Sequence, residues 1–268
     1  MSGDRAQTSW WRAAAVHALA ERAAAEASAA LRAGGVAHVV IKGLAASHTL
    51  YDDPLERPFR DVDLFVGWGS LPRARRALEA AGLGESAGLR SLHTSVFRPR
   101  APGGPDIDVQ GWLGYALLPR GGVAALCARA TIIKARGGGR FPALDALDAG
   151  CVSALYAVRE RLRPEAKSLL ADVERATMLG GEGPLARRAD ELGLRAFVDV
   201  ALSALGLSPD PAAARRAQAL PWLDRRAPRA MSALPALLAG PSPRALASFA
   251  SSALVLGAEH AGRHLRKP

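Results

Sequence analysis

The sequence contains little cysteine and has no apolar stretch long enough to cross a membrane. Its two cysteines, Cys127 and Cys151, lie in apolar surroundings without the spacing of metal ligands, which argues against a disulfide framework. Charged and polar residues interrupt the Ala-rich N-terminal stretch before it reaches the length of a signal peptide or a transmembrane helix. These residues are Arg12, His17, Glu21, Arg22 and Glu26. We therefore expect a cytoplasmic protein with reduced thiols and no membrane partner.

Several familiar motifs are also missing. No Ser-His-Asp or Cys-His order stands out, so nucleophilic hydrolysis has little support. The glycine-rich segment 135–140 lacks the form of a phosphate-binding P-loop and is expected to turn a hairpin between strands at 131–134 and 140–142. Basic residues are not interleaved with aromatic ones, which argues against single-stranded nucleic acid as the main partner.

Positive charge is what the sequence has in excess. Its 268 residues carry 35 Lys and Arg against 25 Asp and Glu, a formal net charge of +10. Such a balance favours anionic partners such as nucleotides or phosphorylated substrates. The arginines are dispersed, however, and the alternative is that they only solvate helix surfaces. With 49% hydrophobic residues, the chain is expected to fold around a sizeable core.

The hydrophobic periodicity predicts a mixed first half and an all-helical second half. We expect helices at 8–31, 44–51 and 70–82, and strands at 36–42, 61–67, 92–99 and 106–112. Further helices are predicted near 145–162, 164–179, 184–192, 194–205, 211–218, 229–238 and 243–260. The fold class is therefore α+β, with an N-terminal helix (1–33), a sheet-containing catalytic domain (34–142) and a helical domain (143–268).

Two pairs of aspartates are placed one residue apart within predicted strands. Asp61 and Asp63 project to one side of their strand because residues i and i+2 share a face, and Asp106 and Asp108 do the same later in the chain. Like charges held this close require a compensating cation. If the two strands are neighbours, the carboxylates converge and would select Mg²⁺ or Mn²⁺.

A simpler interpretation of the first aspartate pair stays open. Asp61 and Asp63 could cap a turn at the strand end, or pair with Arg57 and Arg60 on the preceding loop. The longer pattern around them favours the metal site. It consists of "IKGLA" at 41–45, "LY" at 50–51, "DP" at 53–54, "RP" at 57–58 and "RDVDLFV" at 60–66.

This pattern resembles a nucleotidyltransferase family of the polymerase-β-like superfamily, whose members read roughly "KG…LY.DP..RP..DIDLLV" followed by a strand with an acidic residue. The likeness extends more loosely over residues 34–207. It implies a polymerase-β-like mixed sheet with flanking helices, followed by an all-helical C-terminal domain. It also implies that Asp61, Asp63 and Asp108 are the catalytic metal ligands and that Gly43 lets the backbone approach the nucleotide phosphates.

The sequence departs from the superfamily pattern at two places. The usual Gly-Ser turn is here Lys42-Gly43-Leu44, so Lys42 is proposed to supply charge to the phosphates. Relatives often carry a histidine two residues after the third acid, directly before a tryptophan, where this chain has Gln110, Gly111 and Trp112. The third carboxylate is therefore either Asp108 or Asp106.

Two more residues are candidates for nucleotide binding. Arg57 could hold a phosphate with two hydrogen bonds, or could only neutralise the aspartates. His93 could contact the nucleotide or acceptor, or could be structural.

The predicted reaction transfers AMP from ATP, or another nucleoside monophosphate, to an oxygen of a small molecule, peptide or protein, with release of pyrophosphate. Two alternatives remain: an inactive nucleotide-binding or regulatory module, and an RNA nucleotidyltransferase acting on a tRNA end.

Overall fold

A seven-stranded mixed sheet forms the centre of the protein. The computed structural model describes residues 2–86, 94–113, 122–160 and 162–207. The strands are β1 (Val39–Ile41), β2 (Val62–Phe65), β3 (Gly84–Glu85), β4 (Thr94–Arg98), β5 (Ile107–Gln110), β6 (Thr131–Lys134) and β7 (Arg140–Ala143), in the spatial order β3-β4-β5-β2-β1-β7-β6. β2 pairs with β5 and β1 with β7 in parallel, and the other neighbouring strands pair antiparallel. The predicted α+β class is confirmed.

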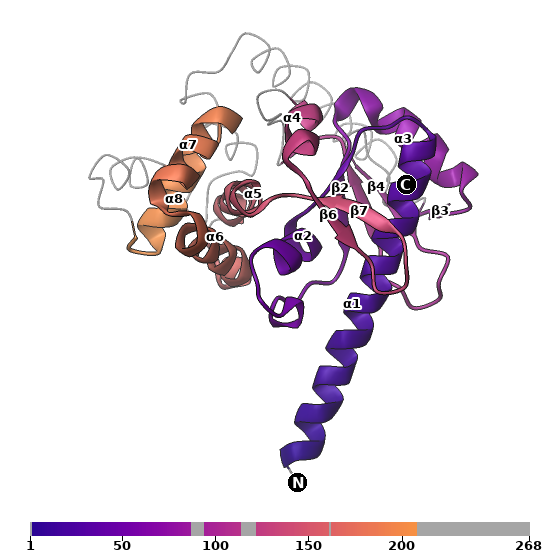
Figure 1. Ribbon diagram of the computed structural model, residues 1–268, viewed down its shortest axis with the longest axis horizontal. Helices are drawn as coiled ribbons and strands as arrows, with labels where there is room; N and C mark the ends of the chain where they lie inside the picture. Colours follow the sequence, from indigo (N-terminus) through magenta and orange to yellow (C-terminus); the bar gives the residue numbers. More distant parts are fainter. Residues whose placement is uncertain (1, 87–93, 114–121, 161, 208–268) are drawn as a thin grey trace, which may run out of the picture.

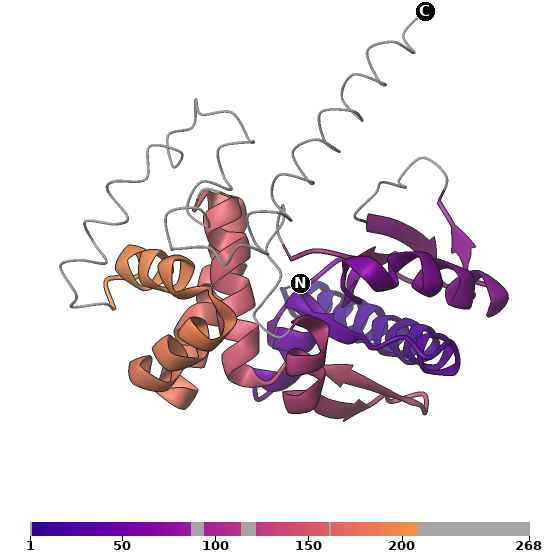
Figure 2. The same ribbon diagram turned by 90° about the horizontal axis from the view of Figure 1, so that it is seen from above.

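Helices surround the sheet and continue the chain beyond it (Figure 1). They are α1 (Ser2–Ala33), α2 (Lys42–Thr49), α3 (Leu71–Ala80), α4 (Gly122–Arg129), α5 (Ala146–Arg159), α6 (Lys167–Gly180), α7 (Glu182–Leu192) and α8 (Arg195–Ala204). Short 3₁₀ helices lie at η1 (Pro54–Glu56), η2 (Trp68–Ser70) and η4 (Pro164–Ala166). α1 packs along α3, β2 and β7, whereas α5 packs against α2, α6, α7 and α8. Helices α5 to α8 form a group beside the sheet (Figure 2). None of the described helices is both long enough and apolar enough to cross a membrane.

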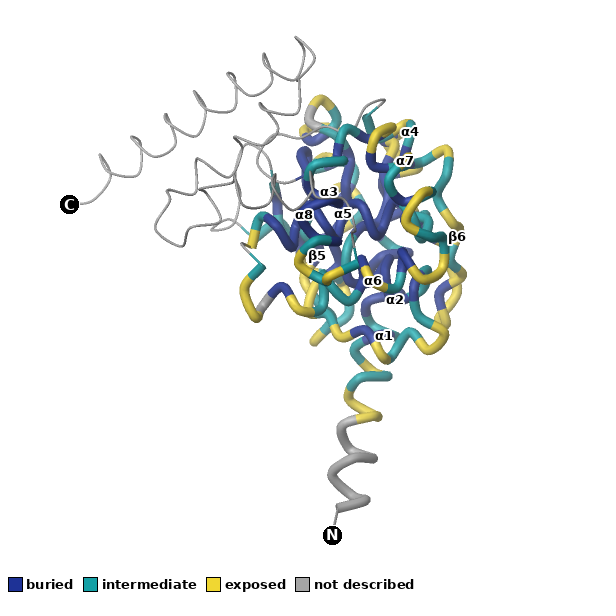
Figure 3. Tube along the Cα trace, turned by 90° about the vertical axis from the view of Figure 1, so that its left-hand side faces the viewer, coloured by how far each residue is buried: buried dark blue, intermediate teal, exposed yellow. Residues whose placement is uncertain are grey.

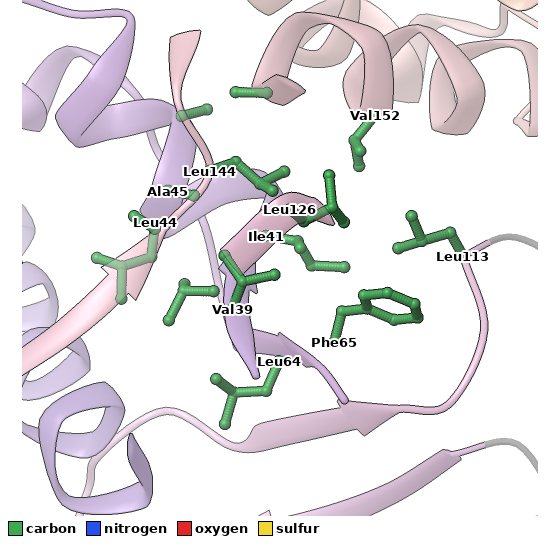
Figure 4. Packing of buried hydrophobic residues seen from close by; sticks show 14 of the residues in the cluster. Val39, Ile41, Leu44, Ala45, Leu64, Phe65, Leu113, Leu126, Leu144 and Val152 are labelled. Carbon is green, nitrogen blue, oxygen red and sulfur yellow. The ribbon is translucent and has the colours of Figure 1, made fainter. Parts of the chain in front are cut away.

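The hydrophobic core lies where β1 and β2 meet the surrounding helices. Every residue of these two strands is buried, as expected for central strands. Side chains of Ile41, Phe65, Leu126 and Val152 gather around them from strands and helices far apart in sequence (Figure 4). The N-terminal turns of α1 instead project beyond the body of the protein, and Trp11 there is 60% exposed (Figure 3).

The main differences from the predicted elements have local causes. The first strand ends at Ile41 because Lys42 turns the chain with a positive φ of 55° and begins α2. Helix α4 and the two-residue strand β3 were not predicted from the sequence pattern. The predicted helices at 211–218, 229–238 and 243–260 lie outside the described residues, and the proposed domain boundaries stay predictions.

Candidate active site

Two aspartates lie side by side on the neighbouring parallel strands β2 and β5. The strand register pairs Asp63 with Asp108, so both side chains lie on the same face of the sheet. Asp63 is buried and Asp108 half-buried, whereas Asp61 lies exposed just before β2. Asp106 is also exposed and lies one step before β5, where its carbonyl oxygen accepts a hydrogen bond from the Val62 amide (2.9 Å). The neighbour of Asp63 is thus Asp108.

Lys42 supplies the positive charge next to this carboxylate pair. The antiparallel pairing of Ile41 with Asp63 brings the following residue, Lys42, to the start of β2. From there the Lys42 Nζ atom reaches the Asp63 Oδ1 atom at 2.5 Å, and it lies 4.2 Å from the centre of the Tyr156 ring. The ammonium is therefore held by a carboxylate and by the face of an aromatic ring together.

Gln110 joins the two carboxylates to helix α5. Its Nε2 group donates to Asp63 Oδ1 (2.6 Å) and to Asp108 Oδ2 (2.8 Å). The Tyr156 hydroxyl donates to Gln110 Oε1 (2.6 Å), which fixes the orientation of the amide. The Thr94 hydroxyl donates to Asp108 Oδ1 from β4. The result is a largely buried hydrogen-bond network that spans α2, β2, β4, β5 and α5.

The electrostatics of the site are dominated by the burial of Asp63. Burial raises the pKa of Asp63 to about 7, and the negative charges of Asp61 and Asp108 act in the same direction, while Lys42 opposes them. Burial by itself lowers the pKa of Lys42, but Tyr156, Asp63 and Asp108 outweigh it, so the pKa of the ammonium lies above its ordinary value. Lys42 therefore stays charged at neutral pH.

The carboxylates do not converge on a single point as expected for a three-ligand metal site. Across the described ranges, no group of three or more His, Cys, Asp or Glu side chains could hold a metal ion. The reason is visible in the contacts, because Lys42 and Gln110 both donate to Asp63 and Asp61 lies outside the network. The oxygen donors themselves suit a hard divalent ion, provided that Lys42 leaves Asp63.

Arg57 is held by contacts away from the aspartates of β2, and its predicted role in phosphate binding stays a prediction. Its guanidinium donates to both oxygens of the fully buried Asp172, at 2.7 and 2.9 Å, and to the Pro58 carbonyl at 2.5 Å. Asp172 also accepts hydrogen bonds from the Tyr51 hydroxyl (2.9 Å) and the Ser153 hydroxyl (3.0 Å). These contacts leave Arg57 paired with α6 instead of with the aspartates of β2. The arginine and tyrosine of the sequence pattern thus anchor the loop before β2 to the helices.

Close packing requires a glycine at position 43, which the sequence pattern did not indicate. A Cβ atom at this position would lie 2.5 Å from the Phe59 Cβ atom, so only glycine fits. Gly43 is the second residue of α2, where backbone amides lack helical acceptors and no side chain caps them. A phosphate at this helix end remains compatible with the geometry. His93, the other predicted nucleotide-binding residue, lies outside the described residues.

Two residues of the network escaped the sequence interpretation. Tyr156 and Thr94 come from segments whose patterns indicate only a buried helix and a strand. The signal for Tyr156 was weak: a tyrosine within an Ala-, Val- and Leu-rich helix must find a partner for its hydroxyl when buried. Its partner, Gln110, could be identified only from the fold.

The site thus consists of aspartates on adjacent strands of a mixed sheet that is flanked by helices. The family model described as an uncharacterised nucleotidyltransferase matches residues 5–207, so the chain belongs to this family. A search of curated proteins found no match.

Two solved structures are similar at low identity. One is an antigenic nucleotidyltransferase-like protein from Paracoccidioides brasiliensis, with 16% identity and a TM-score of 0.47, covering 77% of this chain and 92% of that chain. The other is the antibiotic-resistance factor ANT(2'')-Ia, with 14% identity and a TM-score of 0.42, covering 68% of this chain and 91% of that chain.

Proposed function

We propose that the protein transfers a nucleoside monophosphate, AMP from ATP in the first instance, to an oxygen of an acceptor molecule and releases pyrophosphate. The observation that carries the proposal is the register of β2 and β5, which places Asp63 beside Asp108 within reach of the N-terminus of α2. The acceptor is a small molecule, a peptide or a protein.

The proposed metal ligands are Asp61, Asp63 and Asp108, with Mg²⁺ or Mn²⁺ as the ion. When bound, such an ion would neutralise the triphosphate and favour deprotonation of the attacking hydroxyl. Gln110 and Thr94 would orient the carboxylates, because they already donate to them. Asp106 is disfavoured as the third ligand, since Asp108 is the register partner of Asp63.

The triphosphate is proposed to lie at the N-terminus of α2. The first amides of this helix lack acceptors and would donate to phosphate oxygens, with the helix dipole favouring negative charge there. Lys42 is the first residue of the helix and would bring its ammonium to the same phosphates. The hydrogen bonds of the Arg57 guanidinium to Asp172 argue against a part for Arg57 in this binding.

Transfer of label from α-labelled nucleotides tests the proposal. The protein is incubated with each labelled triphosphate, Mg²⁺ and a lysate of the source cell, and the fraction that gains label is identified. We expect Asp63→Asn and Asp108→Asn to reduce labelling by about 100-fold or more. Asp106→Asn is the matched control, because it removes a nearby exposed carboxylate outside the network. Undiminished labelling by Asp63→Asn would refute the proposed site.

The second candidate function is nucleotide binding without turnover. The salt bridge between Lys42 and Asp63 favours it, because this pair neutralises the carboxylate without a metal ion. Calorimetry distinguishes the two functions. Binding of Mg-ATP without release of pyrophosphate in the presence of the lysate would identify a binding or regulatory module.

A further inference from the structure

The position of Lys42 is enforced by several independent contacts. Its backbone has a φ of 55°, a left-handed conformation that Leu162 alone shares among the non-glycine residues described. Such a conformation is costly for a side chain with a Cβ atom and persists only where surrounding contacts impose it. Here the salt bridge to Asp63 and the ring of Tyr156 hold the side chain, which is 19% exposed.

One oxygen of the Asp63 carboxylate, Oδ1, is fully occupied by hydrogen bonds. Asp63 Oδ1 accepts from Lys42 Nζ at 2.5 Å and from Gln110 Nε2 at 2.6 Å. A carboxylate oxygen has two lone pairs, so this atom has no capacity left for a metal ion. An ion on the other oxygen of the same carboxylate would still lie close to the ammonium and be repelled by it.

We propose that Lys42 and the divalent ion are mutually exclusive partners of Asp63, so that the metal ion binds well only after Lys42 has moved. This inference rests on the proposed function and adds an order of events to it: Lys42 leaves Asp63 first, and the metal ion binds afterwards. In the structure the protein's own cation, Lys42, balances the buried Asp63 carboxylate.

The triphosphate is the partner that can draw Lys42 away. Lys42 begins α2, so its ammonium needs only a change of side-chain rotamer to turn from Asp63 toward an anion at the helix N-terminus. Loss of the ammonium would leave Asp63 buried without a counter-ion, which favours entry of the metal ion. Nucleotide and metal therefore strengthen each other's binding by the same factor.

Metal binding to nucleotide-free protein tests the inference without relying on activity. Free Mn²⁺ is measured by electron paramagnetic resonance during titration of the wild type, Lys42→Met and Lys134→Met. Methionine removes the charge with similar length and meets the same backbone strain. Lys134 is exposed on β6, so Lys134→Met controls for the loss of one positive charge. We expect Lys42→Met to bind Mn²⁺ about tenfold more tightly than the wild type, and Lys134→Met to match the wild type.

A second arm adds a non-hydrolysable ATP analogue. The analogue should raise the Mn²⁺ affinity of the wild type more than that of Lys42→Met, because the variant has no ammonium to displace. Free analogue also chelates Mn²⁺, but it does so equally in both titrations. This effect therefore cancels when the Mn²⁺ affinities of the wild type and Lys42→Met are compared. Should Lys42→Met fail to fold, as judged by circular dichroism, Lys42→Gln replaces it with the same expected result.

The outcomes separate this inference from the proposed function. Equal or weaker Mn²⁺ binding by Lys42→Met overturns the competition between Lys42 and the metal ion. If Asp63→Asn still abolishes binding in that case, the proposed metal site stands. If neither the wild type nor any variant binds Mn²⁺, with or without the analogue, both the inference and the proposed metal-dependent reaction fail.

Discussion

The side chain of Arg57 makes contacts that neither of its two predicted roles includes. An arginine before an Asp-x-Asp pair can bind phosphate, yet here it is 5% exposed and bound to Asp172 on α6. The partner lies 115 residues away in the chain, so no local pattern could have identified it. The need for glycine at position 43 could not be predicted either, because its close approach to Phe59 exists only in the folded protein.

Removal of the Asp172 charge should strongly destabilise the protein. In Asp172→Asn the buried guanidinium loses its counter-ion, and we expect the free energy of unfolding to fall by about 3 kcal/mol. The matched control is Glu56→Gln, which breaks the exposed ion pair of Glu56 with Arg175 (2.8 Å). We expect that variant to lose less than about 1 kcal/mol. Urea unfolding measures both, and equal losses would contradict the structural role of the Arg57–Asp172 pair.

Helix α5 connects the carboxylate site with the helices that follow. Its Tyr156 orients Gln110, its Ser153 donates to Asp172, and its Asp148 binds Arg129 and Arg188. The helix is buried over most of its length, and Gly150 lets α6 approach closely. A shift of α5 would therefore disturb the site through Tyr156 and the loop before β2 through Asp172.

A size exchange between α5 and α6 tests this close packing. A Cβ atom at Gly150 would lie 2.4 Å from the Ala176 Cβ atom, so Gly150→Ala should destabilise the protein by about 1–3 kcal/mol. Ala176→Gly should cost about 1 kcal/mol through its lower helix propensity. The double variant should be more stable than the sum of the two losses predicts, because the methyl group has only changed helices. Additive losses in thermal or urea unfolding would show that the two positions do not interact.

Element types were easier to predict than element partners. The alternation of apolar and acidic residues in 61–67 and 106–112 indicated the strands that became β2 and β5, and glycines marked most helix ends. The pairing of β2 with β5 brings Asp63 to Asp108 and depends on the order of strands in the sheet. The sequence analysis could only assume that these two strands are neighbours. Helix α4 was missed because its short apolar segment directly precedes the predicted hairpin.

At the scale of the whole molecule, buried histidines link stability to pH. Burial lowers the pKa of His17 and of His38 below the ordinary value of 6.5. The ring of His38 is 4% exposed, with Nδ1 held by the Val36 carbonyl at 2.9 Å. Both histidines therefore bind a proton less readily in the folded state than in the unfolded chain.

The contribution of these two histidines to the free energy of unfolding should consequently fall as the pH falls below 6.5. In that range the unfolded chain binds protons that the folded protein does not, and these protons favour unfolding, whereas above 6.5 the contribution is complete. Urea unfolding of the wild type and His38→Gln between neutral and mildly acidic pH measures the effect. The variant should show a smaller decrease in stability over this range. An identical slope would show that His38 contributes nothing to the pH dependence.

The bond between Arg57 and Asp172 also limits how the chain can be divided or recombined. A fragment ending at the sheet would contain every aspartate of the site, yet it would expose an arginine built to be covered by α6. A chimaera that borrows the helical segment of a relative must keep Asp172 or replace Tyr51 and Arg57 with it. The helical segment and the loop before β2 therefore have to be exchanged together in this protein.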